Sequence, residues 1–162
     1  NLRVNDTCGL DYMKIDEIVR QAKDTGNLDL VLVDYVQIIN SIDARWKNKA
    51  DLIKEATTHL KQIAIKYDVA VLALCQINRQ GVQDGKQPSL TDLKGSGGIE
   101  EDADVVIILH RDQAGDEESA TYSNNGKLII AKNRFGMTNN VPINFDGRYA
   151  QFNELTRNYD GF

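Results

Sequence analysis

Two polar residues stand at the ends of apolar segments in this 162-residue sequence, and their types suit phosphate chemistry. Asp34 follows the apolar run 30–33, and Gln76 follows the run 69–75. In open α/β sheets, ligands bind at the carboxyl ends of the strands. Carboxylates together with phosphate oxygens commonly hold Mg²⁺, and an amide can hydrogen-bond an attacking water or a terminal phosphate. Asp34 is thus a candidate metal ligand and Gln76 a candidate phosphate contact; the structural alternatives are a turn cap and a strand-end cap.

A glycine-rich segment, residues 92–104, is a second candidate site. Gly95, Gly97 and Gly98 lie within four residues and leave backbone N–H groups accessible to an anion such as a phosphodiester. Lys94 beside them adds a positive charge. The spacing fits neither the dinucleotide fingerprint nor a Walker A loop, which needs Gly-Lys-Ser or Gly-Lys-Thr. The structural alternative is a flexible loop before a short helix that begins near Gly98.

Two cations, Lys132 and Arg134, lie two residues apart near the end of a predicted strand. They would project to the same side if the strand continues through them. Such a pair can reach a phosphate bound by a neighbouring subunit, in the manner of an arginine finger. The structural alternative is a solvated strand edge that resists aggregation.

The elements that would position these residues follow from periodicity and capping. Residues 11–26 and 49–67 each carry a helical apolar stripe, and the first has Asp11 and Gly26 as its caps. The apolar runs that end at Asp34 and Gln76 predict strands, the first of them buried on both faces. Strand, helix and strand in this order predict a parallel pair.

The remaining segments predict strands over 104–110, 127–132, 141–145 and 149–152, the middle two forming an antiparallel hairpin. Loops are expected over 40–48, which holds the only Trp, Trp46, and over 77–98 and 111–126. No repeat or linker interrupts the chain, so one domain over 1–162 is predicted.

Composition excludes several protein classes. Hydrophobic residues make up 41% and charged residues 27%, as in ordinary globular domains. No apolar run approaches the roughly 18 residues that a membrane span requires. The net charge of −5 argues against a nonspecific nucleic-acid coat but permits a few local phosphate contacts. With two cysteines, a reducing cytosolic setting fits best.

Together these segments resemble the motor domain of the DnaB-type hexameric replicative helicases. Residues 34–37 are similar to that family's Walker B signature Asp-Tyr-Leu-Gln, and residues 75–79 to its Ser-Gln-Leu-Asn-Arg motif, with Cys75 in place of Ser. Residues 92–104 resemble its loop Asp-Leu-Arg-Glu-Ser-Gly-Ser-Ile-Glu-Gln-Asp-Ala-Asp, and residues 131–136 its segment Lys-Gln-Arg-Asn-Gly. The four motifs occur in the family's order, and the match runs from about residue 5 to residue 152.

The resemblance implies an α/β fold of RecA-like type, in three layers, with a mostly parallel twisted sheet and an antiparallel hairpin at one edge. It implies ATP and Mg²⁺ as cofactors, a homo-hexamer, single-stranded DNA as a partner, and a primase and helicase loader as further partners. A bacterial or phage-infected cytoplasm is the implied location. The roles it implies are as follows: Asp34 holds Mg²⁺, Gln76 senses the γ-phosphate, Lys94, Gly95 and Gly97 contact DNA, and Lys132 and Arg134 reach the adjacent subunit's γ-phosphate.

The sequence also departs from the family. Lys94 replaces an Arg and loses its bidentate fork, Gly95 replaces an acid, and His59 stands where an Arg is frequent. The family's Walker A lysine and catalytic glutamate lie upstream of residue 1. The chain is therefore expected to be the carboxyl-terminal portion of a longer helicase motor and to be inactive alone.

Two other functions compete with the motor. A non-hydrolysing RecA-like assembly or recruitment module is consistent with the missing Walker A loop. A metal-dependent nuclease would use Asp34, Asp92 and Asp104 as a carboxylate cluster. Asp104 begins its predicted strand whereas Asp34 ends its own, so a parallel sheet would place these two carboxylates at opposite edges.

Overall fold

The computed structural model describes residues 2–41, 47–77, 87–90, 98–114 and 121–155. The chain divides into two compact units. The first comprises residues 1–78 and 93–103, and the second comprises residues 79–92 and 104–162. The predicted loop 77–98 lies largely outside the described residues, and so does Trp46.

Helix α1 (Tyr12–Thr25) opens the first unit and follows its predicted boundaries. The Asp11 carboxylate accepts a hydrogen bond of 2.9 Å from the Lys14 N–H, which satisfies one of the four donors left open at a helix start. At the other end, the N–H of Gly26 donates to the Lys23 carbonyl. Local capping signals therefore define this helix.

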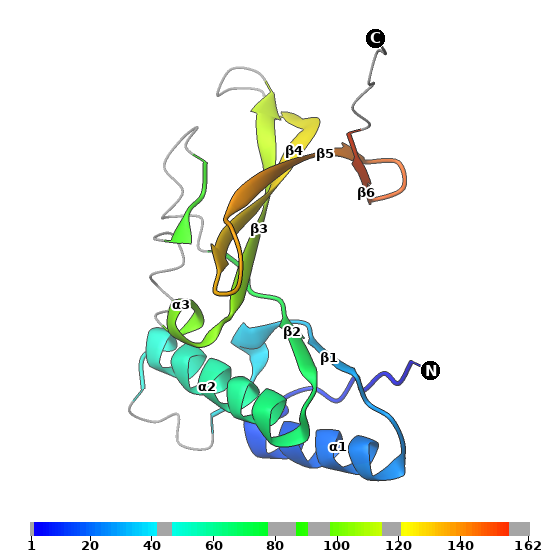
Figure 1. Cartoon of the computed structure of the whole chain (residues 1–162), viewed down its shortest axis with the longest axis vertical. Helices are drawn as coiled ribbons and strands as arrows, with labels where there is room; N and C mark the ends of the chain where they lie inside the picture. The colour runs from blue at the N-terminus through cyan, green and yellow to red at the C-terminus, as the bar shows by residue number, and fades with distance from the viewer. Residues whose placement is uncertain (1, 42–46, 78–86, 91–97, 115–120, 156–162) are drawn as a thin grey trace. The chain divides into compact units, whose positions relative to one another are not determined.

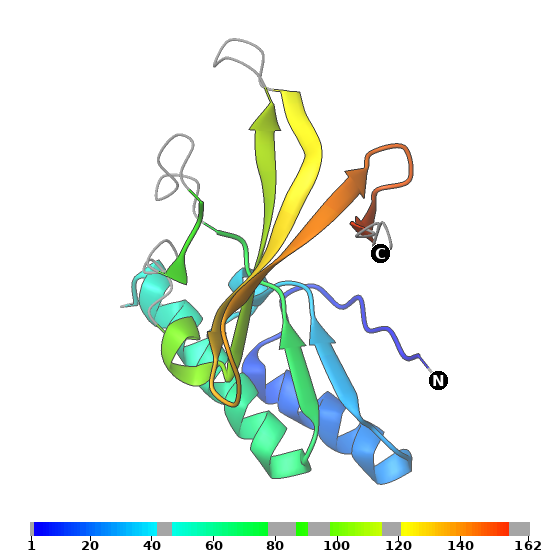
Figure 2. The ribbon, with the colours of Figure 1, turned by 45° about the horizontal axis from the view of Figure 1, so that its top comes forward.

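A parallel strand pair and its crossover helix form the centre of the first unit (Figure 1 and Figure 2). The elements are β1 (Leu30–Val33), the 3-10 turn η1 (Val36–Ile38), α2 (Lys49–Tyr67) and β2 (Ala70–Ala73). Strands β1 and β2 pair in parallel from Leu30↔Ala70 to Val33↔Ala73, which confirms the predicted βαβ unit. Turn η1 was not predicted. Strand β1 coincides with the predicted run 30–33, whereas β2 is shorter than the predicted run 69–75.

The core of this unit lies between the two helices and one face of the strand pair. Its buried members are Val19, Val36, Ile53, Ala56, Leu60 and Ile63. Val31, Val33 and Val71 pack against this cluster from the strands. Leu30 and Leu32 are 52% and 58% exposed. The prediction of a strand buried on both faces was wrong for the described chain, because α1 and α2 cover only the face that carries the valines.

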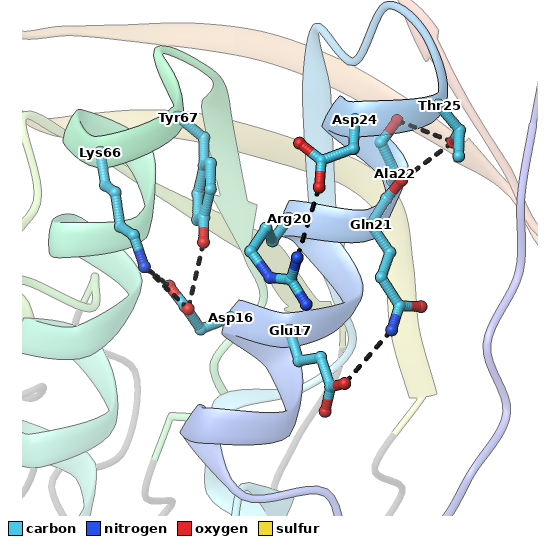
Figure 3. Close-up of polar contacts among 9 residues, drawn as sticks. All are labelled: Asp16, Glu17, Arg20, Gln21, Ala22, Asp24, Thr25, Lys66 and Tyr67. Atoms are coloured by element: carbon cyan, nitrogen blue, oxygen red, sulfur yellow. Dashed lines mark hydrogen bonds and ion pairs between the residues drawn. The ribbon is translucent and has the colours of Figure 1, made fainter.

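Polar contacts also join the two helices (Figure 3). Lys66 Nζ lies 2.9 and 3.0 Å from the two carboxylate oxygens of Asp16, and the Tyr67 hydroxyl donates to the same carboxylate at 3.1 Å. Tyr67 and Lys66 belong to the last turn of α2, whereas Asp16 lies in the first half of α1. These contacts fix the register of the helices beneath β1 and β2.

The second unit is an antiparallel sheet of four strands in the order β3-β4-β5-β6. Its strands are β3 (Val105–Ala114), β4 (Thr121–Asn133), β5 (Asn139–Asp146) and β6 (Gln151–Glu154). The predicted hairpin of 127–132 and 141–145 is confirmed as β4 and β5. The last strand lies two residues later than predicted.

The predicted loop over 111–126 was wrong at both ends. Strand β3 continues to Ala114, β4 already begins at Thr121, and the register includes Arg111↔Gly126 and Gln113↔Tyr122. Backbone hydrogen bonds between strands do not require apolar side chains, so a polar composition did not reveal this extension. The antiparallel part is thus more extensive than a single edge hairpin. No helix in the described part of the chain is long and apolar enough to cross a membrane.

Candidate functional site

The two predicted site residues of the first unit lie at the same edge of the parallel pair. Asp34 follows β1 directly, and Gln76 comes three residues after the end of β2. Beyond the strands, the Leu74 N–H donates to the Val33 carbonyl and the Val36 N–H donates to the Leu74 carbonyl, both at 2.9 Å. The side chains of Asp34 and Gln76 are exposed. The prediction that the carboxyl ends of the two strands lie at the same edge of the sheet is confirmed by the parallel register of β1 and β2.

Gln37 joins these two strand ends, and sequence reasoning gave it no role. Its amide Nε2 donates to the Gln76 carbonyl at 2.8 Å, and its Oε1 accepts from the Gln76 N–H at 3.3 Å. Nε2 also lies 3.0 Å from Cys75 Sγ. One amide thus pairs with both backbone groups of Gln76, as a neighbouring strand would. The signal in the sequence was its place three residues after Asp34, within the Walker B-like motif.

The donor set at this edge fits a metal shared with a phosphate ligand. Among the residues that the structure describes, no group of three His, Cys, Asp or Glu side chains could hold a metal ion by itself. Asp34 instead offers one exposed carboxylate. Mg²⁺ usually keeps several waters and binds one or two carboxylates plus substrate phosphates, so a single Asp is an adequate protein contribution.

The predicted cations of the second unit lie where β4 ends. Lys132 pairs with Val106, whereas Ile130 pairs with Ile107, so Ala131 is one extra residue in β4. Such bulges bend a strand and redirect the side chains beside them. Strand β4 ends at Asn133, and Arg134 lies beyond it in the turn to β5. Lys132 and Arg134 were expected on the same side only if the strand continued through both of them. Because β4 ends between them, this condition is not met.

Arg134 is held by Asp104, which immediately precedes β3. Arg134 Nη1 donates to Asp104 Oδ1 at 3.0 Å, and the Arg134 N–H donates to the Asp104 carbonyl at 2.9 Å. Asn133 braces the same turn: its Oδ1 accepts from the Phe135 N–H at 3.2 Å, and its Nδ2 donates to the Met137 carbonyl at 3.3 Å. Sequence reasoning gave Asp104 a functional role only in the competing nuclease cluster.

The predicted DNA contacts, Lys94, Gly95 and Gly97, lie outside the described residues. The segment that follows them is described: α3 (Ile99–Asp102) is the short helix expected near Gly98. Asp102 Oδ2 accepts hydrogen bonds from the hydroxyls of Thr57 and Thr58 on α2, at 2.8 and 2.9 Å.

Gly98 allows α3 to approach α2 closely. A Cβ at this position would lie 2.5 Å from the Cα of Lys54 and 2.7 Å from the hydroxyl of Thr57. Neither contact distance is compatible with a side chain unless α2 or α3 shifts. The carboxyl end of the glycine-rich segment is therefore anchored to α2 by close packing and by the Asp102 hydrogen bonds.

The carboxylates of the nuclease hypothesis do not form a described cluster. Asp34 follows its strand and Asp104 precedes its own, as predicted, while Asp92 lies outside the described residues. The Asp104 carboxylate is engaged by Arg134. A carboxylate paired with a guanidinium is a poor start for a two-metal site, which needs several converging acids.

A family model described as "DnaB-like helicase C terminal domain" matches residues 1–154. The chain belongs to this family. The DnaB-like assignment agrees with the resemblance seen in the four motifs and gives no support to a nuclease.

Curated relatives of the chain are replicative DNA helicases. The chain is 35% identical to the DnaB helicase of Leifsonia xyli subsp. xyli, covering 95% of this chain and 34% of that one. It is 36% identical to DnaB of Mycobacterium leprae, with 96% and 26% covered. It is 35% identical to the replicative DNA helicase DnaC of Bacillus subtilis, with 97% and 35% covered. The chain thus spans about a third of the length of the Leifsonia and Bacillus relatives.

Two solved structures share the fold of the DnaB-like chain. A solved ATPase domain superposes with a TM-score of 0.84 at 34% identity, over 96% of this chain and 55% of that one. The second is a DnaB-like replicative helicase, in a structure that describes its interactions with primase. It superposes with a TM-score of 0.83 at 34% identity, over 96% of this chain and 38% of that one. The predicted RecA-like α/β class is confirmed by these neighbours.

Proposed function

We propose that this DnaB-like chain is part of the motor of a replicative DNA helicase, which couples ATP hydrolysis at subunit interfaces to movement along single-stranded DNA and duplex unwinding. The observation that carries the proposal is the shared edge of β1 and β2, where Asp34 and Gln76 follow neighbouring parallel strands. Open α/β sheets place their ligands at such an edge. The two units of the chain would together form the carboxyl-terminal portion, 1–162, of one RecA-like ATPase domain.

The residues at this edge would divide the work on the nucleotide. The Asp34 carboxylate would hold Mg²⁺ directly or through water, and bound Mg²⁺ would neutralise charge on the β- and γ-phosphates. The Gln76 amide would hydrogen-bond the γ-phosphate or the attacking water. Because the Gln37 side chain hydrogen-bonds both backbone groups of Gln76, the position of Gln76 is coupled to the segment that carries Asp34.

Lys132 and Arg134 would act on the nucleotide of an adjacent subunit. A cation supplied in trans stabilises the charge that develops on the transferred phosphoryl group. The bulge at Ala131 and the turn braced by Asn133 present the two residues at the end of β4, and the Arg134 side chain is 49% exposed. This role requires a ring, and we propose a homo-hexamer.

Lys94, Gly95 and Gly97 would contact the phosphate backbone of single-stranded DNA. The anchoring of Gly98 and α3 on α2 supports the proposal, because it fixes one end of the segment that carries them. Each subunit would contribute few phosphate contacts, so strong binding would require several subunits acting together. A primase and a helicase loader are the further partners that we propose, in the cytoplasm of a bacterial or phage-infected cell.

The motor function is tested by DNA-stimulated ATP hydrolysis of the complete protein. Asp34→Ala should lower kcat more than about 100-fold, because a bound metal supplies several kcal/mol of charge stabilisation. Asp24→Ala is the matched control: Asp24 is exposed on α1, pairs with Arg20 and has no assigned role. Chain 1–162 alone should show no turnover. Full activity of the Asp34→Ala ring, or robust turnover by 1–162, would contradict the proposal.

DNA contact by Lys94 is tested in the same complete protein. Lys94→Ala should weaken single-strand binding and reduce the dependence of affinity on salt, since each neutralised phosphate releases counterions. Lys14→Ala, which alters a lysine on α1, is a suitable control. Unchanged affinity and salt dependence would remove Lys94 from the DNA-binding residues.

A further inference from the structure

We infer that Asp104 is a positioning residue for Arg134, which it holds at the end of β4 in the orientation that a neighbouring subunit's phosphate requires. The inference rests on the proposed function, since it assigns the support for the cation proposed to act in trans. Asp104 has no role in the proposed nucleotide chemistry, and the family resemblance assigned it none.

Asp104 contacts Arg134 at two levels. The Asp104 carbonyl accepts from the Arg134 N–H at 2.9 Å and so fixes the backbone from which the side chain departs. The Asp104 carboxylate accepts from Nη1 of the guanidinium at 3.0 Å and so fixes the other end of the side chain. A long side chain held at both ends loses most of its rotamer freedom before any phosphate arrives, so less entropy is lost on binding.

The turn around Arg134 is also ordered by its neighbours. Asn133 pairs with Val105, the first residue of β3, and its amide bridges the Phe135 N–H and the Met137 carbonyl. Gly136 packs on the same amide, where a Cβ would come within 2.7 Å of Asn133 Nδ2. Asp104 therefore acts on a turn that is already braced on its other side.

The ion pair leaves donor capacity for a phosphate. Within the described part of the chain, Nη1 is the guanidinium nitrogen of Arg134 that has a partner. A guanidinium has five N–H donors in a planar fork, so Nε and Nη2 can still donate to an incoming oxyanion. The side chains of Arg134 and Asp104 are 49% and 35% exposed, so a ligand can reach the pair.

A positioning role and a restraining role predict opposite results. If the carboxylate only withheld Arg134 from the phosphate, its removal would raise kcat and tighten nucleotide binding. If it orients the guanidinium, its removal leaves ground-state binding nearly unchanged and lowers kcat, because the contact matters most in the transition state. We assign the orienting role, since one edge of the guanidinium stays available.

The test compares variants of the complete protein in kcat, KM and equilibrium affinity for a non-hydrolysable ATP analogue. Asp104→Ala should lower kcat roughly 10- to 100-fold, the loss expected from a misplacement of about 1 Å, and should change KM and analogue affinity less than about twofold. Asp104→Asn keeps an acceptor oxygen and should give a smaller loss. Asp146→Ala is the matched control, because it removes an ion pair of the same kind, Arg148 Nη2 to Asp146 at 2.7 Å.

An Arg134→Ala background distinguishes the positioning role of Asp104 from the proposed action of Arg134 in trans. There Asp104→Ala should cause no further loss, because its effect passes through the guanidinium. An equal loss in both backgrounds, or an unchanged or higher kcat in the single variant, would overturn the positioning role. Full activity of Arg134→Ala itself would instead refute the action in trans that we propose for Arg134. Asp104→Asn, which is nearly isosteric, keeps the test valid if Asp104→Ala fails to assemble.

Discussion

The packing of Gly98 against α2 makes a sharp prediction about stability. Its backbone is right-handed helical, with φ −87° and ψ −27°, so no conformational rule demands glycine there. The requirement is steric: a Cβ would lie 2.5 Å from the Cα of Lys54 and 2.9 Å from its Cβ. Backbone atoms cannot rotate away, so Gly98→Ala must move α3 or α2.

The size of the effect follows from two opposing contributions. Overpacking of a closely packed contact costs about 1–3 kcal/mol. Replacing glycine by alanine also reduces the entropy of the unfolded chain, which stabilises by about 0.4–1 kcal/mol. The net loss should be about 1–2 kcal/mol, and since 1 kcal/mol corresponds to about 2–4 °C for a domain of this size, Tm should fall by about 2–8 °C.

The assay is thermal and urea-induced unfolding of chain 1–162, followed by circular dichroism. Gly26→Ala is the matched control, because a Cβ there meets nothing within 4 Å and its φ of 167° is extended backbone. It should leave Tm nearly unchanged. A Gly98→Ala variant as stable as the parent would refute the packing argument. In the complete protein, the same variant should also weaken single-strand DNA binding by displacing the base of the glycine-rich segment.

Two further predictions concern Gln37 and Glu55. Gln37→Glu keeps the acceptor for the Gln76 N–H but places a carboxylate against the Gln76 carbonyl. It should therefore lower both kcat and the stability measured by urea unfolding more than a substitution at an exposed helix position does. A variant as stable as the parent would contradict the pairing of Gln37 with the Gln76 backbone. Burial alone would raise the pKa of Glu55, but hydrogen bonds from Ser41 and Lys47 outweigh it and hold the pKa below its ordinary value of 4.5. Because the pKa of Glu55 is lower in the folded state, its contribution to stability is complete above the ordinary pKa and is lost as the pH falls through the folded pKa. Glu55→Gln should therefore flatten the acid limb of a plot of Tm against pH. An unaltered acid limb would exclude this contribution of Glu55.

The helices illustrate what local sequence signals can predict. Helix α2 begins at Lys49 and ends at Tyr67, as predicted from its apolar stripe, and the Asn48 side chain caps its start by accepting from the Asp51 N–H. Capping and periodicity depend on residues within one or two turns, so the sequence contains the whole signal. The parallel pairing of β1 and β2 followed for the same reason, because a crossover helix between two strands requires it.

The strands show where such reasoning fails. The apolar run of β1 predicted burial on two faces, yet only the face toward α1 and α2 is covered in the described chain. The polar stretch after His110 predicted a loop, yet it pairs as the far end of the β3–β4 hairpin. Both features depend on partners distant in sequence, and a strand's own composition does not contain them.

The sequence by itself determined the family, the order of the four motifs, and the presence of an acid and an amide after two parallel strands. Only the tertiary structure decided which groups support them. Gln37 grips the Gln76 backbone across 39 residues, and Asp104 holds Arg134 across 30. The Thr57 and Thr58 hydroxyls bind Asp102 in a similar way. The physical reason is that a supporting hydrogen bond depends on where two distant backbones meet, and residue type alone does not specify that meeting point.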